Sequence, residues 1–187
     1  MAEALKRINV TREMMLQRVA RFKDLQGSDG GLPDSNMPAH IRTLFNVIGF
    51  QPPEADSEAV TSPVGDNASR LAAIKISEGF NLGFCKALPG KGPMMHNHDT
   101  NETFIAITGR WRCSWEDEKG EVDFVDLDPL DVCSFPAGAA RRFENVTEGD
   151  ANHESILMFV ISGNAPKAEF TDKAMAEIKA AGVSTSR

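Results

Sequence analysis

Short apolar segments follow one another from residue 69 to residue 163, and this series limits the possible folds more than any other feature. Eight segments are rich in apolar, β-branched and aromatic residues: SRLAAIKIS, FNLGFCKAL, ETFIAIT, RWRCSW, VDFVDL, LDVCSF, RRFENV and ESILMFVIS. Gly, Pro, Asp and Asn separate them, and no helix-length pattern interrupts them, so parallel β-α-β units are not expected. The series predicts an all-β fold, an antiparallel sandwich or barrel.

The N-terminal third of the chain has a different pattern. Met15, Val19 and Phe22 recur at helical spacing, and the stretch MPAHIRTLFNVIGF is expected to hold one short helix. Residues 1–65 bury too little apolar surface to be stable alone. We therefore expect them to form a helical and loop extension that packs on the barrel or on a partner subunit.

The C-terminal stretch TDKAMAEIKAAG has the composition and the boundaries of a helix. Thr171 can cap its first turn, and Gly182 follows its last turn. The chain is therefore expected to divide into the N-terminal extension (1–65), one barrel domain (66–163) and a C-terminal helix (164–187).

The net charge of −7 limits the partners of this chain. Nucleic acids and anionic membranes attract basic surfaces, but the densest basic stretch of this chain is only the pair at 141–142. Neither is therefore expected as a partner. No apolar run approaches the length of a membrane span, and the N-terminus lacks the apolar core of a signal peptide. The cysteines have no disulfide spacing and are expected to be small core residues in a reducing compartment: Cys85, Cys113 and Cys133. The cytoplasm is the predicted location.

The stretch HNHDTNE, residues 96–102, indicates a metal site. On a strand, the period of two places the imidazoles of His96 and His98 on one face. The DTN sequence predicts a turn, so Glu102 begins the returning strand and can face the two histidines. Two imidazoles and one carboxylate suit Fe(II), Mn(II), Ni(II) or Zn(II), with coordination positions left open for water, oxygen or substrate.

Two motifs in this region resemble those of the cupin superfamily. The first motif, with a glycine, an HxH pair, a glutamate and a second glycine, is matched at every position by Gly90, His96, His98, Glu102 and Gly109. The second lies in LDVCSFPAGAARRFEN and is matched by Pro136, Gly138 and Asn145. The resemblance covers residues 69–163. It implies a double-stranded β-helix, or jelly-roll barrel, here with helical extensions at both ends, and a homodimer.

The second motif departs from the family pattern at two positions. Leu130 replaces the first glycine of the motif, and Arg141 replaces the histidine that is the third metal-binding histidine in the family. An arginine is permanently protonated and cannot ligate a metal. A single positive charge about 4 Å from a dication costs about 8 kcal/mol at an effective dielectric constant of 20. The usual four-ligand site is therefore not expected.

Three arrangements of the site are compatible with the sequence. Arg141 can grip an anionic substrate while His96, His98 and Glu102 hold the metal. It can instead pair with Glu102 and leave a metal-free pocket. In the third arrangement, a histidine from elsewhere, at position 40 or 153, completes the ligand set. Phe104 shares the strand face of Glu102, so it is expected to line the barrel interior and contact the substrate.

The function hypotheses follow from these arrangements. The first is a metal-dependent enzyme, an oxygenase of the non-haem dioxygenase type that acts on a small organic anion oriented by Arg141. The second is a metal-free protein that binds a small anionic ligand through Arg141. An isomerase of the sugar type is the third, and it too rests on the resemblance.

Overall fold

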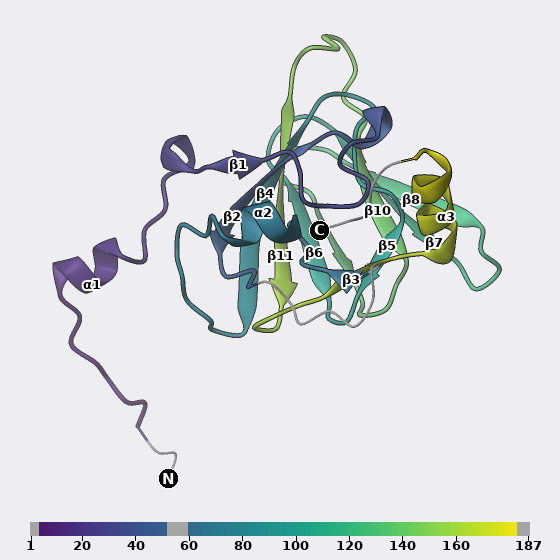
Figure 1. Ribbon diagram of the computed structural model, residues 1–187. Helices are drawn as coiled ribbons and strands as arrows, with labels where there is room; N and C mark the ends of the chain where they lie inside the picture. Colours follow the sequence, from purple (N-terminus) through teal and green to yellow (C-terminus); the bar gives the residue numbers. More distant parts are fainter. Residues whose placement is uncertain (1–3, 52–59, 183–187) are drawn as a thin grey trace.

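The computed structural model describes residues 4–51 and 60–182, and it places two six-stranded sheets face to face (Figure 1). The first sheet has the order β1 (Gly27–Ser28), β2 (Thr43–Ile48), β4 (Phe80–Ala87), β11 (Ser155–Ser162), β6 (Glu102–Ala106) and β9 (Val132–Phe135). The second has the order β3 (Val60–Thr61), β12 (Ala168–Phe170), β5 (His96–His98), β10 (Arg141–Asn145), β7 (Trp111–Glu116) and β8 (Val122–Leu127). Neighbouring strands are antiparallel throughout. The predicted all-β fold is confirmed.

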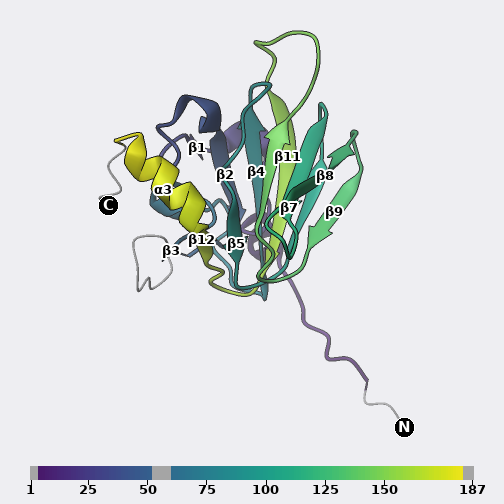
Figure 2. The ribbon, with the colours of Figure 1, turned by 90° about the vertical axis from the view of Figure 1, so that its right-hand side faces the viewer.

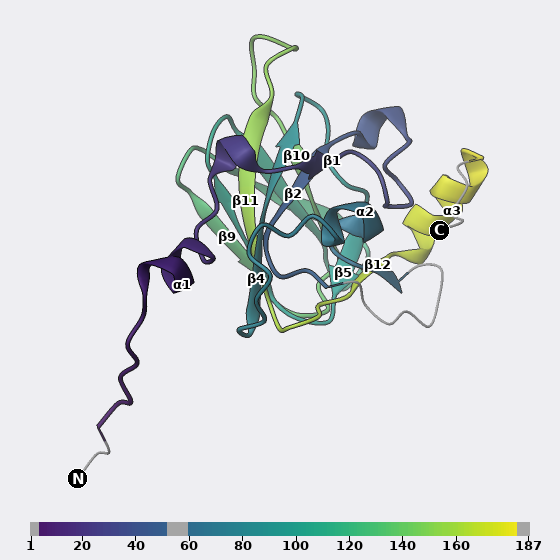
Figure 3. The ribbon, with the colours of Figure 1, turned by 60° about the vertical axis from the view of Figure 1, so that its left-hand side comes forward.

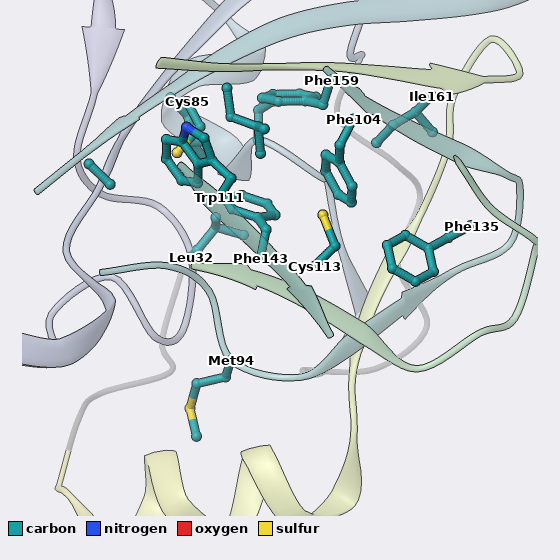
Figure 4. Close-up of a cluster of buried hydrophobic side chains, with 14 of the residues drawn as sticks. Leu32, Cys85, Met94, Phe104, Trp111, Cys113, Phe135, Phe143, Phe159 and Ile161 are labelled. Carbon is teal, nitrogen blue, oxygen red and sulfur yellow. The ribbon is translucent and has the colours of Figure 1, made fainter. Parts of the chain in front are cut away.

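The core lies between the two sheets because side chains alternate along each strand. Buried and half-buried residues follow one another strictly in β6, β10 and β11. The inward-facing aromatic rings meet edge to face, with Phe143 at 5.1 Å from Phe104 and 5.9 Å from Trp111. Figure 4 shows these side chains filling the space between the sheets, with Met94 set apart toward the C-terminal helix.

Seven of the eight predicted strands are present, as β4 and β6–β11. The segment SRLAAIKIS is the exception. Its first residue ends helix α2 (Gly65–Ser69), and only Ile74 forms an isolated bridge, with Ile48 of β2. Ala72 and Ile74 are buried individually rather than in a paired strand, so apolar content alone did not predict the structure of this segment.

A 3₁₀ turn and a strand take the place of the short helix expected in MPAHIRTLFNVIGF. A single 3₁₀ turn (Pro38–His40) is followed by strand β2, which pairs with β4 along most of its length. The β-branched and aromatic residues of β2 favour a strand, and the free edge of β4 supplies its partner. A buried ion pair between Asp34 and Arg42 fixes the loop that leads into the strand, with Nη2 of Arg42 at 3.0 Å from Oδ1 of Asp34.

The two ends of the described chain behave differently. The C-terminal helix α3 (Asp172–Ala180; Figure 2) is capped by Thr171, whose hydroxyl accepts a hydrogen bond from the N–H of Ala174. The helix buries Ala174, Met175 and Ile178. The N-terminal helix α1 (Arg12–Leu16) buries no residue, and the chain before it runs away from the barrel (Figure 3). No helix in the described ranges has the length and apolar character needed to cross a membrane.

The N-terminal segment is attached to the barrel just after α1. Arg18 forms an ion pair with Glu78. Phe22, in the 3₁₀ turn Phe22–Asp24, lies against the rings of Phe45 and Phe84, at 5.5 and 5.3 Å, on the outer face of the first sheet. The segment before residue 18 therefore extends from a fixed point.

Candidate metal centre

Strands from both sheets bring the predicted ligands together inside the barrel. His96 and His98 lie on β5 with both imidazoles facing inward, and Glu102 begins β6 in the opposite sheet. The three side chains are buried, and their ligand atoms all lie within 4.8 Å of one another. Nε2 of His98 lies 3.3 Å from Oε2 of Glu102. The structure therefore brings these three predicted residues into one cluster of metal-binding geometry.

Backbone carbonyl groups fix the orientation of both imidazoles. Nδ1 of His96 lies 2.8 Å from the carbonyl oxygen of Met94, and Nδ1 of His98 lies 2.8 Å from that of Lys167. Because a carbonyl oxygen can only accept a hydrogen bond, each Nδ1 carries a proton. In a neutral ring of this tautomer, Nε2 is the nitrogen with the lone pair. This tautomer is the one that a metal site requires, and a second hydrogen bond of this kind is typical of metal-binding histidines.

The surroundings of the cluster shift the pKa values of His96 and Glu102 toward the protonation states that bind a cation. Burial lowers the pKa of His96 to about 3, and the positive charge of Arg141 adds to this effect, so His96 is neutral near pH 7. Burial by itself would raise the pKa of Glu102, but His98 and Arg141 outweigh it and lower that pKa to about 2. A neutral imidazole and an ionised carboxylate are the forms that bind metals.

Arg141 is directed at the same carboxylate. It begins β10, faces His96 in the register of β10 and β5, and is fully buried. Its Nε and Nη2 groups donate to Oε2 of Glu102 at 3.2 and 3.0 Å, and Nη1 donates to the carbonyl oxygen of Ala139 at 3.2 Å. The ion pair that the second arrangement requires is therefore present. Oε2 of Glu102 is also the oxygen closest to His98, so a metal and the guanidinium would compete for it.

A small cavity adjoins the cluster. Its volume is about 20 Å³, enough for about one water molecule. The histidines and Glu102 form one wall; the remaining lining residues are Arg42, Leu44, Pro63, Pro93, Phe143 and Phe159. Arg42 is the cationic side chain on this wall, and Asp34 neutralises it. Arg141 is not among the lining residues.

The other predicted site residues lie elsewhere. Phe104 is fully buried among the rings of Phe135 and Phe143 and does not line the cavity. His40 uses Nδ1 to bond the carbonyl oxygen of Gly92. His153 is exposed in the loop between β10 and β11. Neither histidine belongs to a metal-binding cluster in the described part of the chain, so nothing there supports the third arrangement.

Sequence reasoning missed most of the cavity wall. Phe143 could have been found, because it lies two residues after Arg141 on the same strand face. Pro93 lies between two residues of the first motif. No sequence pattern predicts that Arg42 and Leu44 line the cavity, because they reach it only through the pairing of β2 with β4.

Comparison with known proteins supports the fold. No protein-family model and no curated protein matches the chain. Among solved structures, vicilin from Corylus avellana (hazelnut) matches with a TM-score of 0.50 and 13% identity over 81% of this chain and 35% of that one. A cupin superfamily protein from Desulfitobacterium hafniense matches with a TM-score of 0.39 and 12% identity over 48% and 72% of the two chains. A protein with a double-stranded β-helix domain from Klebsiella pneumoniae matches with a TM-score of 0.42 and 18% identity over 51% and 75%.

These matches concern the fold alone, and the chain spans only about a third of the length of hazelnut vicilin. The match to hazelnut vicilin agrees with the two facing antiparallel sheets of this structure, in which the strands of both predicted motifs line one barrel. The chain therefore has a fold of two facing antiparallel sheets that is similar to that of hazelnut vicilin.

Proposed function

We propose that this protein is a metal-dependent enzyme that acts on a small organic anion. The observation that carries the proposal is the orientation of the two histidines. Both Nδ1 groups donate to backbone carbonyl oxygens, so both Nε2 atoms are left to bind a cation that the carboxylate of Glu102 can share. A histidine pair with only a packing role would not need two fixed and matching tautomers.

The residues fit a divalent transition metal. Two imidazole nitrogens and one carboxylate oxygen form the ligand set of Fe(II) oxygenases, and Mn(II), Ni(II) and Zn(II) accept the same donors. Such an ion would supply Lewis acidity and open coordination positions for a small ligand. We propose oxygenation of the non-haem dioxygenase type as the reaction class, because three protein ligands leave those positions open.

The buried charges favour an anionic ligand. When a metal takes the carboxylate of Glu102, the permanently charged guanidinium of Arg141 loses its partner in a fully buried position. A buried charge without a partner is strongly unfavourable. A dication, Arg141 and Glu102 together carry two positive charges, so a small anion in the site would restore the balance. The guanidinium can then bind a carboxylate through two parallel N–H groups.

The cavity sets the size of that anion. A volume of about 20 Å³ holds about one group of water size. The proposed substrate therefore has few heavy atoms, unless the loops that carry Pro63 and Pro93 move apart. Asp34, which pairs with the lining residue Arg42, also accepts a hydrogen bond through Oδ2 from the N–H of Met94 at 2.9 Å.

A second candidate function is favoured by the contact between Arg141 and Glu102. In this alternative the ion pair is permanent, the site holds no metal, and the barrel binds a small anion near its cationic groups. The two candidates differ in metal content, which is directly measurable. A sugar-type isomerase has no supporting observation in the cavity, whose volume is below that of a sugar.

The test is elemental analysis of protein purified without chelator and without a metal-binding tag. The proposal predicts close to one equivalent of a divalent transition metal per chain. The double substitution His96→Ala, His98→Ala should remove it. The exposed His153 gives a matched control, because His153→Ala removes a histidine that lies outside the cluster and should leave the metal content unchanged. Equal trace amounts of metal in the wild type and in the double variant would favour the metal-free alternative.

A further inference from the structure

A larger cavity, here called the outer cavity, lies on the outer face of the second sheet. Its volume is about 520 Å³, and side chains of β7, β8, β10 and α3 line it. Figure 4 shows α3, in yellow, on the side of this sheet that faces away from the core. Cavities that bind small organic molecules typically measure about 300–1,000 Å³. The outer cavity is therefore large enough for an organic ligand, unlike the small cavity at the metal centre.

A buried serine lines the outer cavity. Ser114 of β7 lies between Arg142 of β10 and Phe124 of β8 in the register of the three strands. Ser114 is only 3% exposed, yet its hydroxyl makes no hydrogen bond with any residue in the ranges that the structure describes. Buried hydroxyl groups are normally hydrogen-bonded, because an unpaired one is energetically costly. A ligand in the outer cavity supplies the partner that this hydroxyl lacks.

Charged side chains of both signs line the outer cavity: Arg112, Arg142, Lys173, Glu116 and Glu177. Neither of the two carboxylates forms an ion pair within residues 4–51 and 60–182. Each arginine pairs with an acidic residue outside the lining, but a guanidinium has five N–H groups, and such a pair occupies only some of them. A ligand of one charge would satisfy one set of these groups and be repelled by the other, whereas a zwitterion satisfies both.

An apolar surface adjoins these charged groups. The rings and chains of β8 provide it, because Phe124 and Val122 both line the outer cavity and both are exposed. The guanidinium carbon of Arg112 lies 3.8 Å from the centroid of the Phe124 ring, so a cation–π contact holds the ring in place. Ala174 of α3 lines the same cavity. An apolar group of a ligand can therefore pack on the Phe124 ring beside the charged side chains.

From these features we propose that the outer cavity binds a free α-amino acid with a large apolar side chain. Ser114 and Arg142 are neighbours in the strand register and donate hydrogen bonds to the carboxylate of the ligand. Glu116 lies two residues from Ser114 on the same strand face and accepts hydrogen bonds from the ammonium group. The apolar side chain of the ligand packs on Phe124, the neighbour of Ser114 on the other side. The two charged groups of an α-amino acid share one carbon atom, which suits partners so close together.

The test begins with three ligands of one shape, titrated into the full-length chain by isothermal titration calorimetry. L-Phenylalanine carries both charges, 3-phenylpropanoate lacks the ammonium group, and 2-phenylethylamine lacks the carboxylate. L-Phenylalanine should bind at least about 10-fold more tightly than either analogue, because each analogue leaves one set of charged groups unpaired. Equal affinities for the three ligands would overturn the proposal, and so would the absence of L-phenylalanine binding in the millimolar range.

Three substitutions then assign the groups of the ligand to residues. Glu116→Gln should weaken L-phenylalanine binding about 10-fold and leave 3-phenylpropanoate binding unchanged, because only the amino acid carries an ammonium group. Arg142→Gln should weaken L-phenylalanine binding to a similar extent and leave 2-phenylethylamine binding unchanged. Ser114→Ala removes only the hydroxyl oxygen and should weaken both carboxylate ligands about 10-fold. If L-phenylalanine binding were unchanged in all three variants, the amino acid would bind elsewhere and the proposal would be wrong.

Two controls separate the outer cavity from other surfaces and from the metal centre. Glu118 is exposed in the turn between β7 and β8 and lies outside the lining, so Glu118→Gln should leave L-phenylalanine binding unchanged. A chelator should leave it unchanged too, because the inference does not depend on the proposed metal chemistry; loss of binding with chelator would overturn it. Acetate lacks the ammonium group and the apolar side chain, so it should not bind here, and substitution of Arg142 should not alter the binding of such small carboxylates to the barrel.

Discussion

Arg141 and His98 approach the same oxygen atom of Glu102. Nε and Nη2 of Arg141 lie 3.2 and 3.0 Å from Oε2 of Glu102, and Nε2 of His98 lies 3.3 Å from it. The guanidinium and the imidazole of one candidate ligand therefore share a single carboxylate oxygen. Whatever cation the site binds must share Glu102 with Arg141, and this competition can be tested by mutation.

Replacing Arg141 by histidine should strengthen metal binding. Arg141→His restores the third histidine of the family pattern and removes a positive charge whose repulsion of a dication is about 8 kcal/mol at 4 Å. We expect the affinity for Zn(II) or Mn(II) to rise by about 100-fold or more, measured by competition with a chelator of known affinity. Binding of small carboxylates should fall in parallel, because the planar fork of donors is lost.

Two further variants make this result specific. Arg141→Lys should only partly preserve carboxylate binding, because an ammonium group lacks the bidentate geometry. Arg142 points to the opposite face of β10 and pairs with Glu144, so Arg142→Ala should change neither metal nor carboxylate binding. If Arg142→Ala abolished carboxylate binding while Arg141→Ala had no effect, the role assigned to Arg141 would be wrong.

The stability of the metal-free protein should fall as the pH decreases below about 6.5. The pKa of His96 is lowered from 6.5 to about 3 in the folded protein, so the unfolded chain binds more protons between these values. The pKa of Glu102 is lowered from 4.5 to about 2 and extends the same trend. Each group contributes a slope of at most about 1.4 kcal/mol per pH unit.

This dependence can be measured by urea unfolding at a series of pH values in the presence of a chelator. His96→Gln should flatten the stability curve between about pH 6.5 and 4.5, because the substituted side chain does not titrate. His153→Gln changes an exposed histidine and should leave the slope as in the wild type. An unchanged slope in His96→Gln would show that His96 is not held neutral by its burial.

Substituting glycine for Leu130 should stabilise the protein. The sequence Asp128–Pro129–Leu130–Asp131 forms a tight turn in which the N–H of Asp131 donates to the carbonyl oxygen of Asp128 at 2.9 Å. Leu130 has a φ of 78° at the third position, which favours glycine in a turn with proline at the second. Leu130→Gly should raise the free energy of unfolding by about 1 kcal/mol.

Leu130→Ala separates the backbone effect from the loss of the side chain. Alanine removes the same apolar surface but keeps the Cβ, so it retains the strain. The difference between the two variants, obtained by urea denaturation, should therefore be close to 1 kcal/mol in favour of glycine. Equal stabilities would mean that the turn accommodates a Cβ without strain.

The buried pair of Asp34 and Arg42 should be essential for the stability of the loop that leads into β2. Both side chains are almost fully buried. Asp34→Ala should lower the free energy of unfolding by about 3–5 kcal/mol, because it leaves Arg42 buried and unpaired. Adding Arg42→Leu to that variant should recover part of the loss. The exposed pair of Arg18 and Glu78 is the control, and Glu78→Ala should cost less than about 1 kcal/mol.

Local sequence patterns were sufficient for the all-β fold and for the ligand cluster. Strand alternation places His96 and His98 on one face regardless of what surrounds them, and the turn after them returns Glu102 to the same side. Turn chemistry was equally local. Gly109, a motif glycine, has a φ of 70°, and a Cβ there would lie 2.0 Å from Oγ of Ser155, so only glycine fits.

Long-range pairing decided the features that local patterns could not supply. Strand β2 exists because the edge of β4 pairs with it, and that pairing carries Leu44 and the neighbouring Arg42 to the cavity wall. The segment SRLAAIKIS has strand-like composition but found no continuous partner, so its apolar residues are buried individually.

The sequence by itself determined the class of fold, the strands that carry the two motifs and the identity of three candidate ligands, because each depends on contacts between residues close in the chain or on the period of a strand. Only the tertiary structure decided where the charge of Arg141 goes. Its partner Glu102 is 39 residues away and in the other sheet, and the two meet only when both sheets are assembled. The packing around Arg141 decides which charged group it pairs with, and no local sequence pattern predicts that pairing.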